Sequence, residues 1–118
     1  MTRARALIGT RFRLHGRDAE GIDCIGLIVA TYGLCDVATG YALRTTDASP
    51  IFGALSDAGF APVGELIPGD IVLFDAGPAQ LHLGLWSGTG LIHADAGLRR
   101  VVETPGAPGW PVITIWRR

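Results

Sequence analysis

The second half of the sequence is a series of short strand-like runs separated by glycine and proline, and this pattern constrains the fold more than any other feature. Residues 81–87, LHLGLWS, alternate strictly, with leucines on one face and His82 and Gly84 on the other. Four more runs of similar length have a β-type composition, at residues 70–75, 90–95, 99–104 and 112–116. Short strands joined by tight turns predict an antiparallel sheet.

The first half carries helix signals instead. Asp23 is a good N-cap, Gly33 is a natural C-terminal stop, and the apolar run CIGLIVATY between them predicts a buried helix over residues 24–32. The β-branched residues in this run leave a strand as the alternative. Capping residues and glycines of the same kind predict two further helices, at residues 2–9 and 49–59, the second capped by Ser49. A loop is predicted over residues 9–21.

Helices first and strands second predict an α+β domain, in which N-terminal helices pack on a C-terminal antiparallel β-sheet. The 118 residues suffice for one core, so we expect a single domain over residues 1–118. Ten basic and eleven acidic residues give no electrostatic case for binding nucleic acid or an anionic membrane. We see no run long enough for membrane insertion and no signal core in MTRARALIGTRFR, and therefore expect a protein that is cytoplasmic as synthesised.

Cys24 is the first candidate for chemistry, because the predicted helix places it in the first turn. A helix N-terminus carries partial positive charge and free N–H groups, which favour a thiolate. A thiolate is a good nucleophile for acyl transfer, and a nearby imidazole would activate it further. The free N–H groups could also hold a developing oxyanion.

Two of the three histidines fit a role beside this cysteine. If the strands over residues 81–87 and 90–95 form a hairpin through SGTG, residues whose numbers sum to about 177 lie opposite each other. His82 and His93 are then diagonal neighbours on one face of the sheet. That arrangement suits a base, His82, and a group that orients it, His93.

Each of these residues also has an ordinary structural explanation. A cysteine in a helix is more often a small core residue, and a histidine in a strand is more often a half-buried residue with satisfied hydrogen bonds. A zinc site of two cysteines and two histidines is a third alternative. Ten residues separate the members of each pair, however, where structural zinc sites use about two to five. The second cysteine, Cys35, reads as an ordinary thiol.

Three segments together resemble the NlpC/P60 cysteine peptidases: GTRFRLHGRDAEGIDCIGLIVATYG, IPGDIVLF and LHLGLWSGTGLIHAD. The likeness covers roughly residues 4–103 and is greatest to the short, signal-less members found with phage tails and gene transfer agents. It implies a papain-like α+β fold and cleavage of peptidoglycan stem peptides, typically between D-glutamate and a diamino acid. It implies no metal or organic cofactor.

The resemblance also assigns roles by position. Cys24 matches the nucleophile, His82 the base and His93 the third, polar member of a Cys-His-His triad. Asp23 matches an aspartate that helps bind the free amine of the substrate. Two positions depart from the family pattern, with phenylalanine in place of tyrosine and isoleucine in place of serine on the expected substrate side, at Phe12 and Ile25. These two changes leave the triad intact and the choice of substrate open.

The leading hypothesis is thus a cysteine peptidase that hydrolyses peptidoglycan stem peptides. A catalytically silent structural component of a phage-tail-like particle is the alternative that Phe12 and Ile25 motivate. A cytosolic amidase that recycles cell-wall peptides is another. Because no export signal is evident, the resemblance leads us to expect incorporation in a phage or gene-transfer-agent particle, whose proteins would be its partners besides the stem peptide.

Overall fold

A computed structural model describes residues 2–18, 20–34, 45–106 and 109–118. Among these residues, the strands of the second half form a six-stranded sheet in the order β3-β8-β4-β5-β6-β7, and every pairing is antiparallel. The strands are β3 (Ala61–Val63), β4 (Ile71–Gly77), β5 (Gln80–Trp86), β6 (Gly90–Asp95), β7 (Arg100–Pro105) and β8 (Val112–Arg117). The predicted α+β fold with a C-terminal antiparallel sheet is confirmed.

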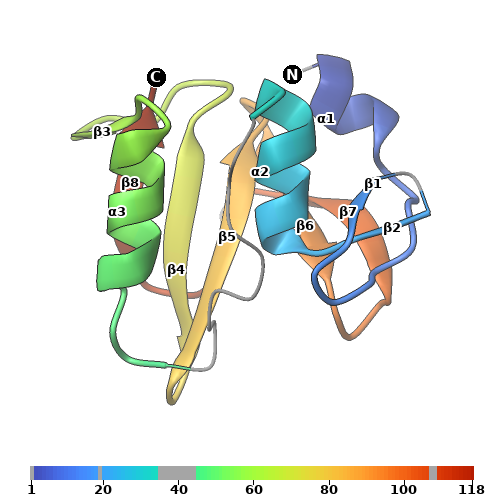
Figure 1. The fold of residues 1–118 in the computed structure, drawn as a ribbon. Coiled ribbons are helices and arrows are strands. Elements are labelled where there is room, and N and C mark those ends of the chain that lie inside the picture. The colour runs from blue at the N-terminus through green and yellow to red at the C-terminus, as the bar shows by residue number, and fades with distance from the viewer. Residues whose placement is uncertain (1, 19, 35–44, 107–108) are drawn as a thin grey trace.

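Two helices cover one face of this sheet. Figure 1 shows α2 (Cys24–Tyr32) beside β5 and β6, and α3 (Ser49–Asp57) beside β4 and β8. Both helices contribute to one apolar core, in which Leu27 of α2 and Leu55 of α3 pack with the buried leucines of β5. The short helix α1 (Thr2–Ala6) packs against α2.

The alternation in β5 separates two apolar clusters. Leu81, Leu83 and Leu85 are buried in the core under the helices. The other face of the sheet holds a smaller cluster of Val72, Phe74 and Leu91, against which three half-buried side chains pack, Trp86, Trp110 and Ile115. The alternating segment LHLGLWS therefore forms a strand with apolar packing on both faces.

Some predicted bounds were wrong for local reasons. Helix α1 ends at Ala6 rather than near residue 9. Ser49 is the first helical residue instead of the cap of α3, because the carboxylate of Asp47 accepts the Ser49 N–H at 3.0 Å. The predicted loop over residues 9–21 contains β1 (Arg17–Asp18), which pairs with β2 (Gly21–Ile22) in a two-stranded hairpin.

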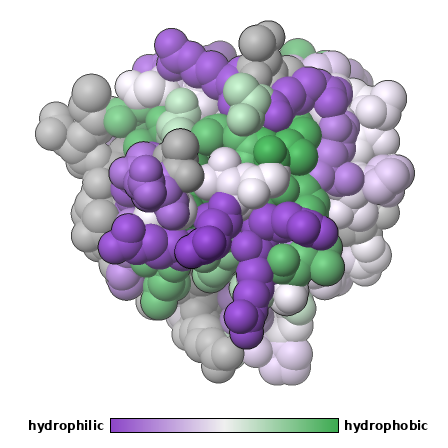
Figure 2. Space-filling view, turned by 90° about the vertical axis from the view of Figure 1, so that its right-hand side faces the viewer, coloured by the Kyte–Doolittle hydropathy of each residue, from purple (hydrophilic) through white to green (hydrophobic). Residues whose placement is uncertain are grey.

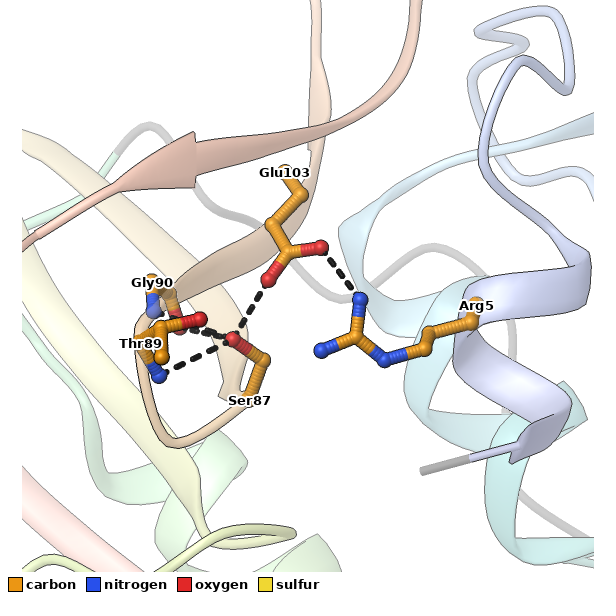
Figure 3. Close-up of polar contacts among 5 residues, drawn as sticks. All are labelled: Arg5, Ser87, Thr89, Gly90 and Glu103. Carbon is orange, nitrogen blue, oxygen red and sulfur yellow. Dashed lines mark hydrogen bonds and ion pairs between the residues drawn. The ribbon is translucent and has the colours of Figure 1, made fainter.

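A polar cluster ties α1 to the far edge of the sheet (Figure 3). Arg5 of α1 contacts the Glu103 carboxylate of β7 at 2.6 Å. The other oxygen of Glu103 accepts the Ser87 hydroxyl at 2.6 Å, and Ser87 itself caps the β5–β6 turn. This cluster therefore joins α1, β7 and the β5–β6 turn at one point.

Figure 2 looks onto the side of the molecule that carries α1, β1 and β2, where hydrophilic side chains spread around smaller apolar areas. Arg3 of α1 and two arginines of the segment that follows it, Arg11 and Arg13, are exposed. In the described part of the chain, no helix has the length and apolar character needed to cross a membrane.

Candidate active site

The start of α2 is fixed by Asp23, as the sequence predicts. The Gly26 N–H donates to Oδ1 of Asp23 at 2.7 Å, and the His15 N–H donates to Oδ2 at 2.8 Å. Asp23 is only 2% exposed, so two backbone donors satisfy its buried carboxylate. Gly33 ends the helix in the left-handed conformation with φ 63°, also as predicted. Cys24 is thereby held as the first residue of a helix with defined ends.

A close contact of two glycines places the first turn of α2 against the preceding loop. A Cβ added to Gly26 would lie 1.9 Å from the carbonyl oxygen of Gly16. The same carbonyl accepts the Asp23 N–H at 3.3 Å. Because no side chain larger than hydrogen fits at position 26, the glycine two residues after Cys24 is a steric requirement of the site.

Cys24 is buried against the sheet, with 3% of its surface exposed. Burial raises the pKa of its thiol to about 12, and the Asp23 carboxylate adds to this effect. The backbone N–H groups of Leu83 and Ile25 hydrogen-bond to the sulfur and lower the pKa in part. The thiolate favoured by the helix N-terminus is therefore outweighed by burial, and the resting group is a neutral thiol. The sulfur therefore lies against β5 at Leu83, which follows His82 in the strand and has its side chain on the opposite face.

The strand register brings the two histidines together as predicted. Leu85 pairs with Ile92 and Trp86 with Leu91, and both pairs sum to 177. Within the described strands, the β5–β6 ladder stops at these two pairs. Beyond them, Nε2 of His82 lies 2.9 Å from Nδ1 of His93. The diagonal contact inferred from the turn is thus a direct hydrogen bond.

Two residues that the sequence reasoning missed complete the surroundings of this pair. Thr104 of β7 holds its Oγ1 2.9 Å from Nε2 of His93. The Trp110 ring packs edge-to-face on both imidazoles, at centroid distances of 5.2 Å to His82 and 6.0 Å to His93. Pairing the neighbouring predicted strands at residues 90–95 and 99–104 would have indicated Thr104, whereas Trp110 lies in a connection with no motif.

Burial keeps both imidazoles neutral. The pKa of His82 is lowered to about 4, and burial is the largest cause. The neighbouring His93 also lowers this pKa, whereas Asp95 raises it. Burial also lowers the pKa of His93. A neutral imidazole is the form that accepts a proton, so the pair has the protonation state of a general base near neutral pH.

The remaining candidates lie in different places. Ile25 is 8% exposed and packs in the core between α2, α3 and β5. Phe12 is half-buried beside Ile22 and packs on the same core. Cys35 lies outside the described residues. No cluster of three or more metal-binding side chains occurs among the residues that are described.

Comparison with known proteins identifies the family and the fold of the chain. The model of the NlpC/P60 family matches residues 9–114. The chain belongs to the NlpC/P60 family. Its curated relatives include murein DD-endopeptidase MepS/murein LD-carboxypeptidase of Escherichia coli (strain K12), 30% identical over 104 residues, which cover 86% of this chain and 51% of MepS. The probable endopeptidase NlpC of the same strain is 34% identical over 89 residues, covering 73% of this chain and 53% of NlpC.

This NlpC/P60 chain thus spans about half the length of the curated relatives it matches. Among solved structures, NlpC1 from Trichomonas vaginalis superposes with a TM-score of 0.72 at 21% identity, covering 99% of this chain and 43% of NlpC1. The NlpC/p60 domain of the peptidoglycan hydrolase SagA gives a TM-score of 0.58 at 25% identity, covering 88% of this chain and 84% of that domain. The predicted NlpC/P60 fold is confirmed.

Proposed function

We propose that this NlpC/P60 domain is a cysteine peptidase that hydrolyses peptidoglycan stem peptides at the bond between D-glutamate and the diamino acid. The observation that carries the proposal is the hydrogen bond of His82 to His93 at 2.9 Å, on the strand whose Leu83 N–H binds the Cys24 sulfur. The family and the murein-directed relatives supply the substrate class.

The hydrogen bonds of the two histidines suit a general base. If His93 donates from Nε2 to Thr104, its Nδ1 is an acceptor, and His82 must donate to it from Nε2. That tautomer leaves Nδ1 of His82 free to accept the thiol proton of Cys24. When His82 becomes a cation, its Nε2–H still donates to His93, which therefore holds and stabilises the ring in both states.

Catalysis would then proceed in two steps. Proton transfer from Cys24 to His82 lets the sulfur attack the amide carbonyl, and His82 returns that proton to the amine as the C–N bond breaks. Water then hydrolyses the thioester on Cys24. Asp23 takes the N–H groups of Gly26 and Leu27. The N–H groups of Cys24 and Ile25, which contact the sulfur in the resting site, are candidate oxyanion donors once the sulfur bonds to the carbonyl carbon.

A digest of sacculi that contain meso-diaminopimelate tests this function, with mass spectrometry of the released fragments. The proposal expects new D-glutamate carboxyl ends and free diaminopimelate amines with the native protein, and none with Cys24→Ala. Release of D-alanine ends from cross-links would instead indicate the DD-endopeptidase activity named for MepS. Equal product release by both proteins would rule out Cys24 as the nucleophile.

A non-catalytic structural role is the second candidate, favoured by the 3% exposure and raised pKa of Cys24. It expects Cys24 to react with iodoacetamide at neutral pH no faster than Cys35. If the protein is a peptidase, we expect selective alkylation of Cys24 that depends on His82. Peptide mass mapping of the alkylated native protein and of His82→Ala distinguishes the peptidase function from the structural role.

A further inference from the structure

A large cavity lies beside the histidine pair but belongs to a different part of the fold. Its volume is about 580 Å³, within the range of small-molecule sites. Residues 75–81 at the tip of the β4–β5 hairpin form one wall, and Trp110, Pro111 and Ile113 form the other. Thr45 and Thr46 close one side. The hydroxyl, amide and apolar lining groups are those of a site that binds a flexible, partly apolar ligand.

Trp110 connects this cavity with the candidate active site. The same indole lines the cavity and packs on both imidazoles, at 5.2 Å and 6.0 Å between ring centroids. The Asp75 N–H donates to the Pro111 carbonyl at 2.9 Å, so the two walls are joined by a backbone hydrogen bond. Trp110 is therefore shared between the cavity and the histidine pair.

The charge of the cavity selects among the parts of a stem peptide. Asp75 is the one ionisable side chain among the described residues that line the cavity, and it is exposed. Its Oδ1 accepts the Gly77 N–H at 3.2 Å, which leaves Oδ2 available to a ligand. Stem peptides carry several carboxylates, which Asp75 repels, and one side-chain amine on the diamino acid, which it attracts. In meso-diaminopimelate the carbon of that amine also bears a carboxylate, so the attraction is greatest where this carboxylate is amidated.

We propose that this cavity is the subsite for the side chain of the diamino acid, with the amine of that side chain bound by Asp75. The inference rests on the proposed function, in which His82 protonates the amine that leaves. That amine is the α-amine of the diamino acid, so this residue sits at His82 when the bond breaks. Its aliphatic side chain then passes Trp110 and brings its terminal amine to the hairpin tip.

The subsite therefore selects stem peptides whose diamino acid has a free side-chain amine. In a cross-linked stem that amine is an amide and carries no charge, so Asp75 gains nothing from it. This NlpC/P60 domain would accordingly prefer uncross-linked stems over cross-linked ones.

Two soluble stem peptides test the proposal, both with meso-diaminopimelate whose side-chain carboxylate is amidated, and identical except that the side-chain amine is free in one and acetylated in the other. We expect native protein to cleave the free-amine peptide with the higher kcat/KM, by about threefold, the effect of one exposed ion pair. Asp75→Asn should abolish this preference. Asn retains an oxygen that accepts the Gly77 N–H, so the hairpin tip is kept.

Asp57→Asn is the matched control, because Asp57 is an exposed aspartate at the end of α3 that does not line the cavity. It should keep the preference of the native protein. Equal cleavage of both peptides by native protein, or an unchanged preference in Asp75→Asn, would overturn the subsite while leaving the peptidase function standing. Cleavage of neither peptide would overturn the proposed function and the subsite with it.

Discussion

Replacing Trp110 with alanine tests whether this indole keeps His82 neutral. Burial is the largest cause that lowers the pKa of His82 from 6.5 to about 4. Trp110 covers the imidazole at a centroid distance of 5.2 Å, in an edge-to-face contact. Without the indole, water reaches the histidine pair, and we expect the pKa of His82 to rise to roughly 5 to 6.

The assay is kcat/KM for a soluble stem peptide as a function of pH, because this quantity reports the ionisation of the free enzyme. In the proposed mechanism His82 accepts the thiol proton only while it is neutral, so activity should be present above its pKa and be lost as the pH falls through that value. The acid limb of the native protein should lie near pH 4. In Trp110→Ala it should move up by about one to two pH units, and Trp110→Phe should restore part of the shift.

Trp86→Ala is the control for the loss of a large aromatic side chain. Trp86 is half-buried on the same face of β5 and packs on the same small cluster, away from the ring contacts of the two histidines. It should lower stability without moving the acid limb. A uniform loss of rate in Trp110→Ala with the limb in its original place would refute the reasoning, and melting temperatures at each pH separate unfolding from titration.

Three further substitutions test the framework of the site. Gly26→Ala places a Cβ 1.9 Å from the Gly16 carbonyl and should destabilise the fold by about 2 kcal/mol, whereas Gly53→Ala in α3, where a Cβ meets nothing within 4 Å, should stabilise it; urea titrations compare the two. Thr104→Val removes the hydroxyl at 2.9 Å from His93 and should lower kcat about tenfold with little change in KM, and an unchanged kcat would contradict its role. Asp70→Asn breaks the pair with Arg117 and should cost about 2 kcal/mol, discounted because Arg117 is 36% exposed. Burial raises the pKa of Asp70, but hydrogen bonds from Arg117 and Ile67 lower it overall, so this stabilisation is fully present above pH 3.8. The thermal difference between variant and native protein should shrink below pH 3.8 and be lost as the pH falls through the lowered pKa of Asp70.

Local sequence signals predicted the parts of the fold that depend on neighbouring residues. Asp23 and Gly33 mark the ends of α2 because a carboxylate and a left-handed glycine satisfy the groups left free at helix ends. The SGTG turn defined the β5–β6 register, since a tight turn allows few pairings, and this register predicted the contact of His82 with His93.

The features that sequence did not reveal depend on distant segments. Trp110 reaches the histidines from the connection before β8, which pairs with β4 and not with its neighbour in sequence. The short strands β1, β2 and β3 have two or three residues each, too few for a period. The raised pKa of Cys24 follows from the depth at which α2 packs on the sheet. The position of Cys24 at a helix N-terminus does not reveal that depth.

The early end of the β5–β6 ladder sets the stability of the hairpin against the proposed activity of the site. The N–H of Leu83 is available to the Cys24 sulfur beyond the last pair, Leu85 with Ile92. A variant in which the hairpin paired over two further positions would gain backbone hydrogen bonds and withdraw that donor from the Cys24 sulfur. Selection for heat resistance alone would therefore drive this hairpin toward closure, and selection for turnover would keep it open.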